Sequence, residues 1–218
     1  FAAVATALLT SCATPPGADH HLQIGKNAAD GTVAVTVLLP EHLRGTVWLQ
    51  FEKRSPQGTA TGVPVSALVA PQDQPQFQSP GAPAGWHAHS VVLPLPAGPY
   101  FLSRWMAEVD AKGTVGTSAF MAWPFDVAAG EIVHLGHVRL DIPVPREKEP
   151  LAYRVEATPA READVALVRR NFDVLRRASW KAPDLARWQA VAGHAVFGGT
   201  LQLQQNNTIT VYSAPASR

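Results

Sequence analysis

Short stretches in which apolar and polar residues alternate dominate the middle of this chain. Valines alternate with threonine and alanine over Thr32–Leu39, and Thr46–Glu52 repeats the pattern with larger apolar residues. A period of two sends successive side chains to opposite faces, so each stretch predicts a β-strand with one buried face. Further strands are predicted over residues 63–69, 90–95, 100–109, 114–123, 132–140 and 153–156.

Turn-forming residues separate these predicted strands. The 218 residues include 19 prolines and 16 glycines, and only 16% are charged. Short strands joined by turns every 8 to 12 residues are typical of β-sandwiches, so we predict a mainly β fold, an antiparallel β-sandwich. Pro124 cannot donate a backbone hydrogen bond and is predicted to lie at a sheet edge or a bulge.

The C-terminal region departs from alternation. Thr158 is a suitable N-cap and Pro159 a suitable first residue for a helix, which we predict over Pro159–Ala178. Its apolar residues recur at helical spacing and form one stripe: Val165, Val168, Phe172 and Leu175. A helical turn is expected near 184–189, and alternation around 201–211 predicts a terminal hairpin. Trp180 and Trp188 are expected to seal this region against the sandwich.

The only cysteine, Cys12, follows the apolar run Phe1–Leu8 and the tripeptide Leu9-Thr10-Ser11. This segment resembles the end of a bacterial lipoprotein signal peptide with its lipobox. The resemblance implies cleavage before Cys12, a diacylglyceryl thioether on its sulfur and acylation, for example with palmitate, of its amine. Several acyl chains hold a protein firmly on a membrane, whereas the apolar run is too short to cross a bilayer as a helix.

The lipoprotein resemblance also implies a location and a domain layout. Ala13 stands where an aspartate would favour inner-membrane retention, so we expect a lipid-anchored protein on the periplasmic face of the outer membrane. Residues 1–12 would be the partial signal peptide, 13–30 a flexible tether, 31–144 the sandwich, and 145–218 a helix and hairpin packing on it. A lone cysteine excludes an internal disulfide.

Two glycine-containing motifs carry a second resemblance. Leu95–Leu102 reads LPAGPYFL and Phe125–Leu140 reads FDVAAGEIVHLGHVRL. They resemble the prealbumin-like and carboxypeptidase-regulatory-like sandwich modules of bacterial lipoproteins, a group of uncertain function. The resemblance implies that these glycines turn the chain from one sheet to the other. His134 departs from it, because an aromatic residue is usual there, and so does Pro99.

Histidines are the candidate metal ligands. His87 and His89 are two residues apart, so on a strand they would share a face and present two imidazoles. Zinc requires three or four ligands, and the sequence identifies no third, so no metal and no cofactor is assigned. His134 and His137 are three apart, which predicts opposite faces of a strand. No nucleophile elbow, HExxH helix or phosphate loop is present, and no catalytic residue is assigned.

The proline-rich segment Ala70–Gly85 and the adjacent Trp86 form the predicted binding surface. We expect a non-catalytic binding or accessory module of the cell envelope, with an envelope protein as its partner. Two alternatives remain open at this point: a structural subunit of an envelope or secretion assembly, and a metal-dependent hydrolase using His87 and His89. Residues 1–144 carry a net charge of −3 and 145–218 a net charge of +4. No tract has the basic density of a nucleic-acid site.

Overall fold

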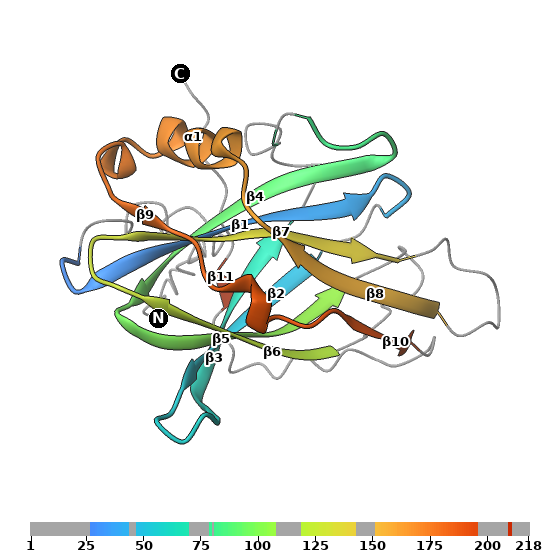
Figure 1. Cartoon of the computed structure of the whole chain (residues 1–218), viewed down its shortest axis with the longest axis horizontal. Coiled ribbons are helices and arrows are strands. Elements are labelled where there is room, and N and C mark those ends of the chain that lie inside the picture. Colours follow the sequence, from blue (N-terminus) through green and yellow to red (C-terminus); the bar gives the residue numbers. More distant parts are fainter. Residues whose placement is uncertain are drawn as a thin grey trace, which may run out of the picture.

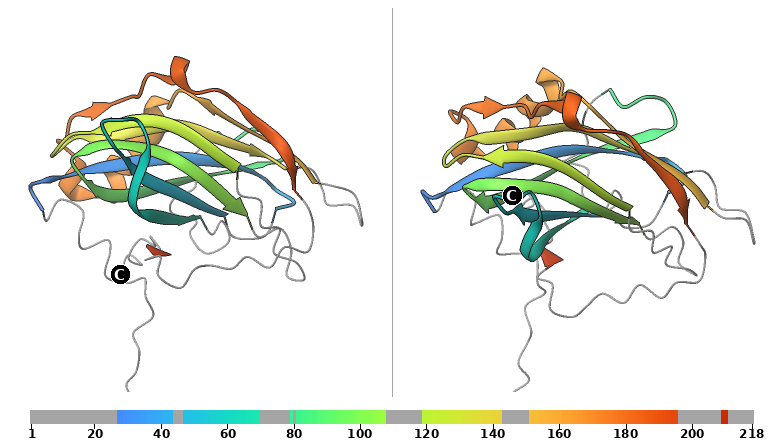
Figure 2. Two further views of the ribbon diagram at one scale, coloured as in Figure 1. Left: turned by 90° about the horizontal axis from the view of Figure 1, so that it is seen from below. Right: turned by 60° about the horizontal axis from the view of Figure 1, so that its bottom comes forward.

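Two β-sheets pack face to face, and a helix covers the outer face of one of them (Figures 1 and 2). The computed structural model describes residues 27–43, 47–69, 79, 81–107, 119–142, 151–195 and 209–210. The predicted signal peptide with Cys12, most of the tether and most of the 70–85 segment lie outside these residues. The predicted mainly β sandwich is confirmed.

The first sheet has the strand order β10-β8-β7-β1-β4, with the short β9 also paired to β7. Its strands are β1 (Asp30–Pro40), β4 (Trp86–Pro96), β7 (Ile132–Asp141), β8 (Leu151–Thr158), β9 (Trp180–Lys181) and β10 (Val191–Ala195). The second sheet has the order β11-β3-β2-β5-β6. Its strands are β2 (Val47–Arg54), β3 (Ala60–Val69), β5 (Gly98–Ala107), β6 (Ala119–Val127) and β11 (Ile209–Thr210).

Strand β1 lies inside the first sheet, between β7 and the edge strand β4. It pairs antiparallel with β4 and parallel with β7, a strand about a hundred residues later in the chain. Val33, Val35 and Val37 point between the sheets and are fully buried, as the alternation predicts. Ala34 and Thr36 on the other face are fully buried too. The expectation of one wet face is therefore wrong for β1, because the helix covers its outer side.

Glycines mark two places where the chain passes from one sheet to the other. Gly98 lies between β4 and β5 with a φ of 147°, and Gly130 precedes β7 with a φ of 71°. The Tyr100 hydroxyl donates a hydrogen bond to the Pro96 carbonyl at 3.0 Å, which fixes the first of these corners. Tyrosines bonded to the backbone a few residues upstream stabilise corners in many sandwiches. Gly98 and Gly130 thus turn the chain between sheets, as expected, whereas the third motif glycine, Gly136, lies within β7.

A β-bulge in β7 changes the direction of two histidines. Along β1 the register advances two residues, from Ala34 to Thr36, while β7 advances three, from His134 to His137. Gly136 occupies the bulge with a φ of 84°, a conformation that favours glycine. Because the bulge adds one residue between them, His134 and His137 both point to the outer face of the sheet. The prediction that they lie on opposite faces is therefore wrong.

The C-terminal helix α1 spans Glu162–Asn171 and is followed by two short 3₁₀ turns, η3 (Asp173–Leu175) and η4 (Leu185–Arg187). It begins later than predicted, because β8 continues through Thr158 and pairs with His137. Arg161, rather than Thr158, is the N-cap. All four residues of the predicted apolar stripe are buried, but only Val165 and Val168 lie on α1, because the helix ends at Asn171, before Phe172 and Leu175.

The two C-terminal tryptophans differ in environment. Trp188 is buried and stacks on Trp123 of β6 with the ring centroids 5.0 Å apart, as expected for a residue that seals this region. Trp180 is 43% exposed, so the same expectation is wrong for it, because β9 lies at the sheet periphery. The 184–189 turn is confirmed as η4. Of the terminal hairpin only Ile209–Thr210 is described, and it pairs with β3.

Candidate functional site

The most concentrated polar cluster in the described part of the chain surrounds Asp164, in the first turn of α1. Its carboxylate is fully buried. One oxygen, Oδ2, lies 2.6 Å from His137 Nε2 and accepts the Arg161 backbone N–H at 2.9 Å. The other oxygen, Oδ1, accepts from the Ser79 hydroxyl and, at 3.1 Å, from Arg161 Nη2. A helix, a strand and the end of the 70–85 segment therefore meet at one carboxylate.

Arg161 extends this cluster toward the surface. Its Nη1 donates to the Gly81 carbonyl at 3.0 Å, and its Nη2 also donates to the Ser79 hydroxyl at 3.1 Å. The backbone of Ser79 donates to the Ala88 carbonyl of β4 at 2.8 Å. We name Ser79, His137, Arg161 and Asp164 the carboxylate clamp. It fixes the C-terminal end of the 70–85 segment to the outer face of the first sheet.

The order of partners in the clamp differs from that of a hydrolytic triad. In a Ser-His-Asp triad the histidine stands between the other two and takes the proton of the serine. Here Asp164 stands in the middle, and both Ser79 and His137 bond to it. Ser79 directs its proton to a carboxylate already engaged by Arg161. This arrangement holds Ser79 in place and does not activate its hydroxyl as a nucleophile.

The clamp sets the charge state of Asp164. Burial alone would raise the pKa of Asp164, but hydrogen bonds from His137, Arg161 and Ser79 outweigh burial and hold that pKa well below its usual range. The carboxylate is therefore ionised at neutral pH and neutralised by the Arg161 guanidinium. A buried charge with several donors is far less costly than an unpaired one.

Two histidines outside the clamp, His134 and His89, are buried and neutral. Burial lowers the pKa of His134 to about 4, against a smaller raising effect of Asp164. Its Nδ1 accepts the Gly136 backbone N–H at 3.1 Å, and its Nε2 has no partner among the described residues. Burial, with a further contribution from His87, lowers the pKa of His89 to about 4.

The structure places the two candidate metal ligands on the inner face of β4. His87 and His89 pair with Leu39 and Val37 of β1, and their ring centroids are 6.4 Å apart. They share a face, as the spacing predicts. Within the described ranges, no three His, Cys, Asp or Glu side chains lie close enough together to hold a metal ion.

Trp86 begins β4 at an edge of the first sheet. It is half-buried, and the Arg139 guanidinium carbon lies 4.2 Å from the centroid of its ring. This distance is that of a cation–π contact. Trp86 also lies close in the chain to Gly81 and Ser79, which the carboxylate clamp holds. The predicted binding residue is therefore positioned, with one ring face covered by an arginine.

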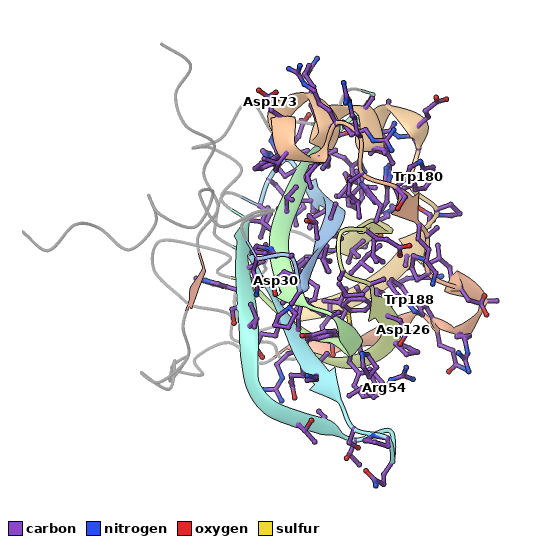
Figure 3. The ribbon with its side chains drawn as sticks, turned by 90° about the vertical axis from the view of Figure 1, so that its left-hand side faces the viewer. Asp30, Arg54, Asp126, Asp173, Trp180 and Trp188 are labelled. Atoms are coloured by element: carbon purple, nitrogen blue, oxygen red, sulfur yellow. The ribbon has the colours of Figure 1, made fainter. Side chains whose placement is uncertain are left out.

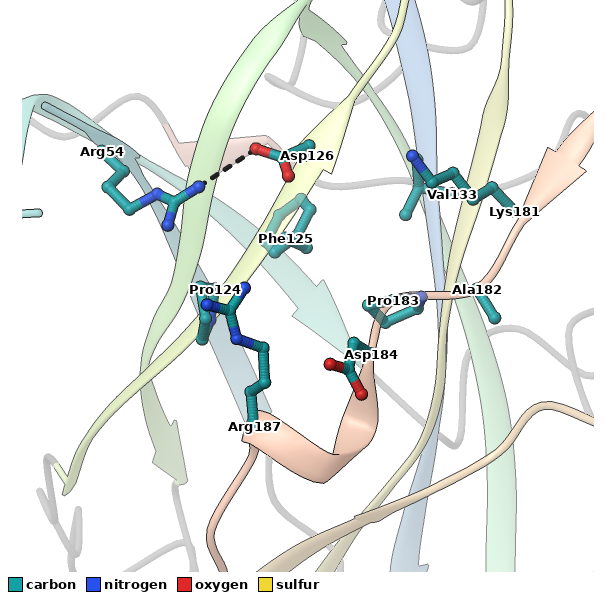
Figure 4. A pocket seen from close by; sticks show the side chains of 10 residues that line it. All are labelled: Arg54, Pro124, Phe125, Asp126, Val133, Lys181, Ala182, Pro183, Asp184 and Arg187. Carbon is teal, nitrogen blue, oxygen red and sulfur yellow. Dashed lines mark hydrogen bonds and ion pairs between the residues drawn. The ribbon is translucent and has the colours of Figure 1, made fainter. Parts of the chain in front are cut away.

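A cleft of about 260 Å³ opens where the two sheets meet beside η4 (Figure 4). Phe125 and Val133 contribute apolar walls. Asp126 and Arg54 form an ion pair at 3.1 Å on one side of the cleft. Its other charged residues are Lys181, Asp184 and Arg187. No sequence pattern indicated this cleft, because its walls come from four separate segments.

Sequence reasoning also missed the clamp. Asp164 was noticeable only as an acid favourable to a helix N-terminus, and nothing marked Ser79 or Arg161. No protein-family model, curated protein or solved structure matches the chain. In the described ranges, no helix combines the length and the apolar character that crossing a membrane requires.

Proposed function

We propose that this chain is a lipid-anchored, non-catalytic binding module of the cell envelope, held through Cys12 on the periplasmic face of the outer membrane. The resemblance of the segment before Cys12 to a lipobox supports the anchor and the location. A sandwich that presents a fixed surface supports the binding role. Its partner is proposed to be another envelope protein.

One observation carries the binding role: the carboxylate clamp fixes the end of the 70–85 segment next to Trp86. Asp164 holds Ser79, and Arg161 holds the Gly81 carbonyl. Binding residues commonly lie on loops positioned by a rigid scaffold. Burying three polar side chains, those of Ser79, His137 and Asp164, to hold a surface segment in place has a stability cost that a purely apolar contact would avoid. A positioned recognition surface accounts for that arrangement.

The binding surface can be tested by affinity capture from envelope extracts. Trp86→Ala is expected to lower the amount of recovered partner at least ten-fold, because aromatic residues at an interface often dominate binding energy. Arg139→Gln removes the cation over the ring but keeps the indole, so it should retain most of the partner. Equal recovery by wild type and Trp86→Ala, with both proteins folded, would refute this surface.

The anchor is tested separately. Mass spectrometry of the native protein should show an N-terminal Cys12 carrying a diacylglyceryl group and an amide-linked acyl chain. An unmodified thiol at position 12 would refute the anchor without bearing on the Trp86 surface. Stoichiometric recovery with several other subunits would instead assign a structural role in an assembly.

A further inference from the structure

The end of α1 and the chain that follows it are strongly basic. Residues 169–181, which we name the basic corner, contain five arginine or lysine residues and one acid, Asp173. The net charge of the basic corner is +4. Arg170 and Arg177 are exposed, whereas Arg176 pairs with Asp173 at 2.7 Å. The same segment carries both large hydrophobic residues that are exposed in the described part of the chain, Val174 and Trp180.

Packing explains why these two apolar side chains face outward. Phe172 and Leu175 insert into the core under α1, and Val174 between them is left 62% exposed. Trp180 pairs with Ile132 of β7, a residue of that same small core. Partners in a parallel ladder point to the same side, so Trp180 lies on the face of the first sheet that α1 covers. Figure 3 shows Asp173 and Trp180 at the periphery of the molecule on this side.

The basic corner also lies near the point where the N-terminal segment enters the fold. Ile132 pairs with Trp180 on one side and with Thr32 of β1 on the other. Two strand spacings, about 10 Å, therefore separate Trp180 from the start of β1. The eighteen residues from Cys12 to Asp30 have a fully extended reach of about 60 Å. An anchor at Cys12 would thus leave the basic corner within reach of the same membrane surface.

We propose that the basic corner docks on anionic phospholipid headgroups. Arginines near an anionic surface each contribute about 1 kcal/mol of attraction, and tryptophan favours the membrane interface, where its ring meets apolar chains and its N–H stays hydrated. Exposed Val174 adds a small apolar contact. This docking builds on the proposed function, because it concerns the membrane on which the anchor would hold the protein. It does not itself require the acyl anchor. Asp30 and Glu131 lie at the nearby strand ends, and they limit the positive surface to the α1 side.

The test uses the chain with Cys12→Ser, so that no acyl group contributes, and vesicles of phosphatidylethanolamine with or without phosphatidylglycerol. Cosedimentation is expected with the anionic vesicles only, and it should fall steeply with added salt. Arg170→Gln with Arg177→Gln should weaken binding about twenty-five-fold, or five-fold for each charge. Trp180→Ser should weaken it about ten-fold. Arg154→Gln, near the opposite end of β7, is the matched control and should change little.

Several results would overturn the proposal. It fails if the Cys12→Ser protein does not bind anionic vesicles, or if Arg154→Gln weakens binding as much as the Arg170 and Arg177 changes. If the protein does not bind vesicles but captures an acidic protein through Arg170 and Arg177, the basic corner binds a protein partner and lipid docking is refuted. Circular dichroism of each variant confirms that it is folded. Lipidation at Cys12 is measured independently by mass spectrometry. Failure of the proposed anchor and failure of the proposed lipid docking can therefore be distinguished.

Discussion

Trp123 and Trp188 each donate an indole hydrogen bond to the backbone beside the other, across the edge of the sandwich. Trp123 donates its N–H to the Gln189 carbonyl at 2.9 Å, and Trp188 donates its own to the Pro124 carbonyl at 2.9 Å. Their rings are nearly parallel, with an interplanar angle of 12°. Each indole bonds to the backbone next to the other, so the pair holds the segment after η4 against edge strand β6.

Replacing either indole should weaken this contact. Trp188→Phe keeps an aromatic ring but removes the hydrogen bond to the Pro124 carbonyl, so we expect a loss of about 1 to 2 kcal/mol of unfolding free energy. Trp123→Phe should behave alike. The double variant should lose less than the sum, with a coupling of about 1 kcal/mol in urea denaturation. Strict additivity would show that the two side chains act independently.

Asp164→Asn tests the carboxylate clamp. The amide keeps the size of the side chain but leaves Arg161 and His137 without their anion, so we expect a loss of about 3 to 5 kcal/mol of unfolding free energy at pH 7. Asp173→Asn is the matched control, because its ion pair with Arg176 is exposed and should contribute less than about 1 kcal/mol. Comparable losses in the two variants would contradict a central role for Asp164.

The Asp164→Asn variant also tests how the stability of the protein changes at acidic pH. The folded pKa of Asp164 is lowered, so its stabilisation is fully present above the unfolded pKa of about 4 and is lost as pH falls further toward the folded pKa. The stability difference between wild type and Asp164→Asn should therefore narrow below about pH 4. Urea midpoints measured from pH 7 to pH 3 test this. A difference that stays constant would show that the charge of Asp164 is not responsible.

His134 should make stability depend on pH in a higher range. Its pKa is lowered from 6.5 to about 4 in the fold, so below pH 6.5 the unfolded chain binds a proton that the folded chain refuses. Stability should fall from pH 6.5 to about pH 4, by up to about 3 kcal/mol for this residue. His134→Gln retains an acceptor for Gly136 and does not titrate, so its urea midpoint should vary less over this range. An unchanged pH slope in His134→Gln would contradict the prediction.

Gly136→Ala should be among the most damaging small substitutions. A Cβ atom there would lie 2.2 Å from the Thr158 carbonyl oxygen, and the residue has a φ of 84°. We expect a loss of about 3 kcal/mol or more. Gly130→Ala is the control, because its φ of 71° is similar but no atom lies within 4 Å of the added carbon. It should lose about 1 to 2 kcal/mol, as measured by thermal or urea unfolding. Equal losses would show that the overlap with Thr158 is relieved.

Local sequence pattern predicted most of the strands and the burial of Val165, Val168, Phe172 and Leu175. Alternation over Thr32–Leu39 lies within β1, because a strand that packs between sheets must bury every second side chain. The start of α1 was misplaced for an equally physical reason. Thr158 and Pro159 have good local propensity for a helix start, but pairing between Thr158 and His137 keeps β8 extended to that point. Non-local pairing outweighed a local preference.

The carboxylate clamp lay beyond sequence reasoning. Asp164 is 85 residues from Ser79 and 27 from His137, and no spacing rule links residues at such separations. The bulge at Gly136 had a local signal, a glycine within a strand pattern, which is a known mark of a bulge. Taking that glycine into account would have placed His134 and His137 on one face.

The parallel pairing of β1 with β7 has a consequence for how the polypeptide acquires its structure. Among the described strands β1 is synthesised first, and both of its neighbours in the ladder come much later, the second only after Ile132. Until then a strand of valines and leucines has open edges, which invites association between unfinished chains. Polypeptides that stop before residue 132 are therefore expected to aggregate unless a chaperone shields this first strand.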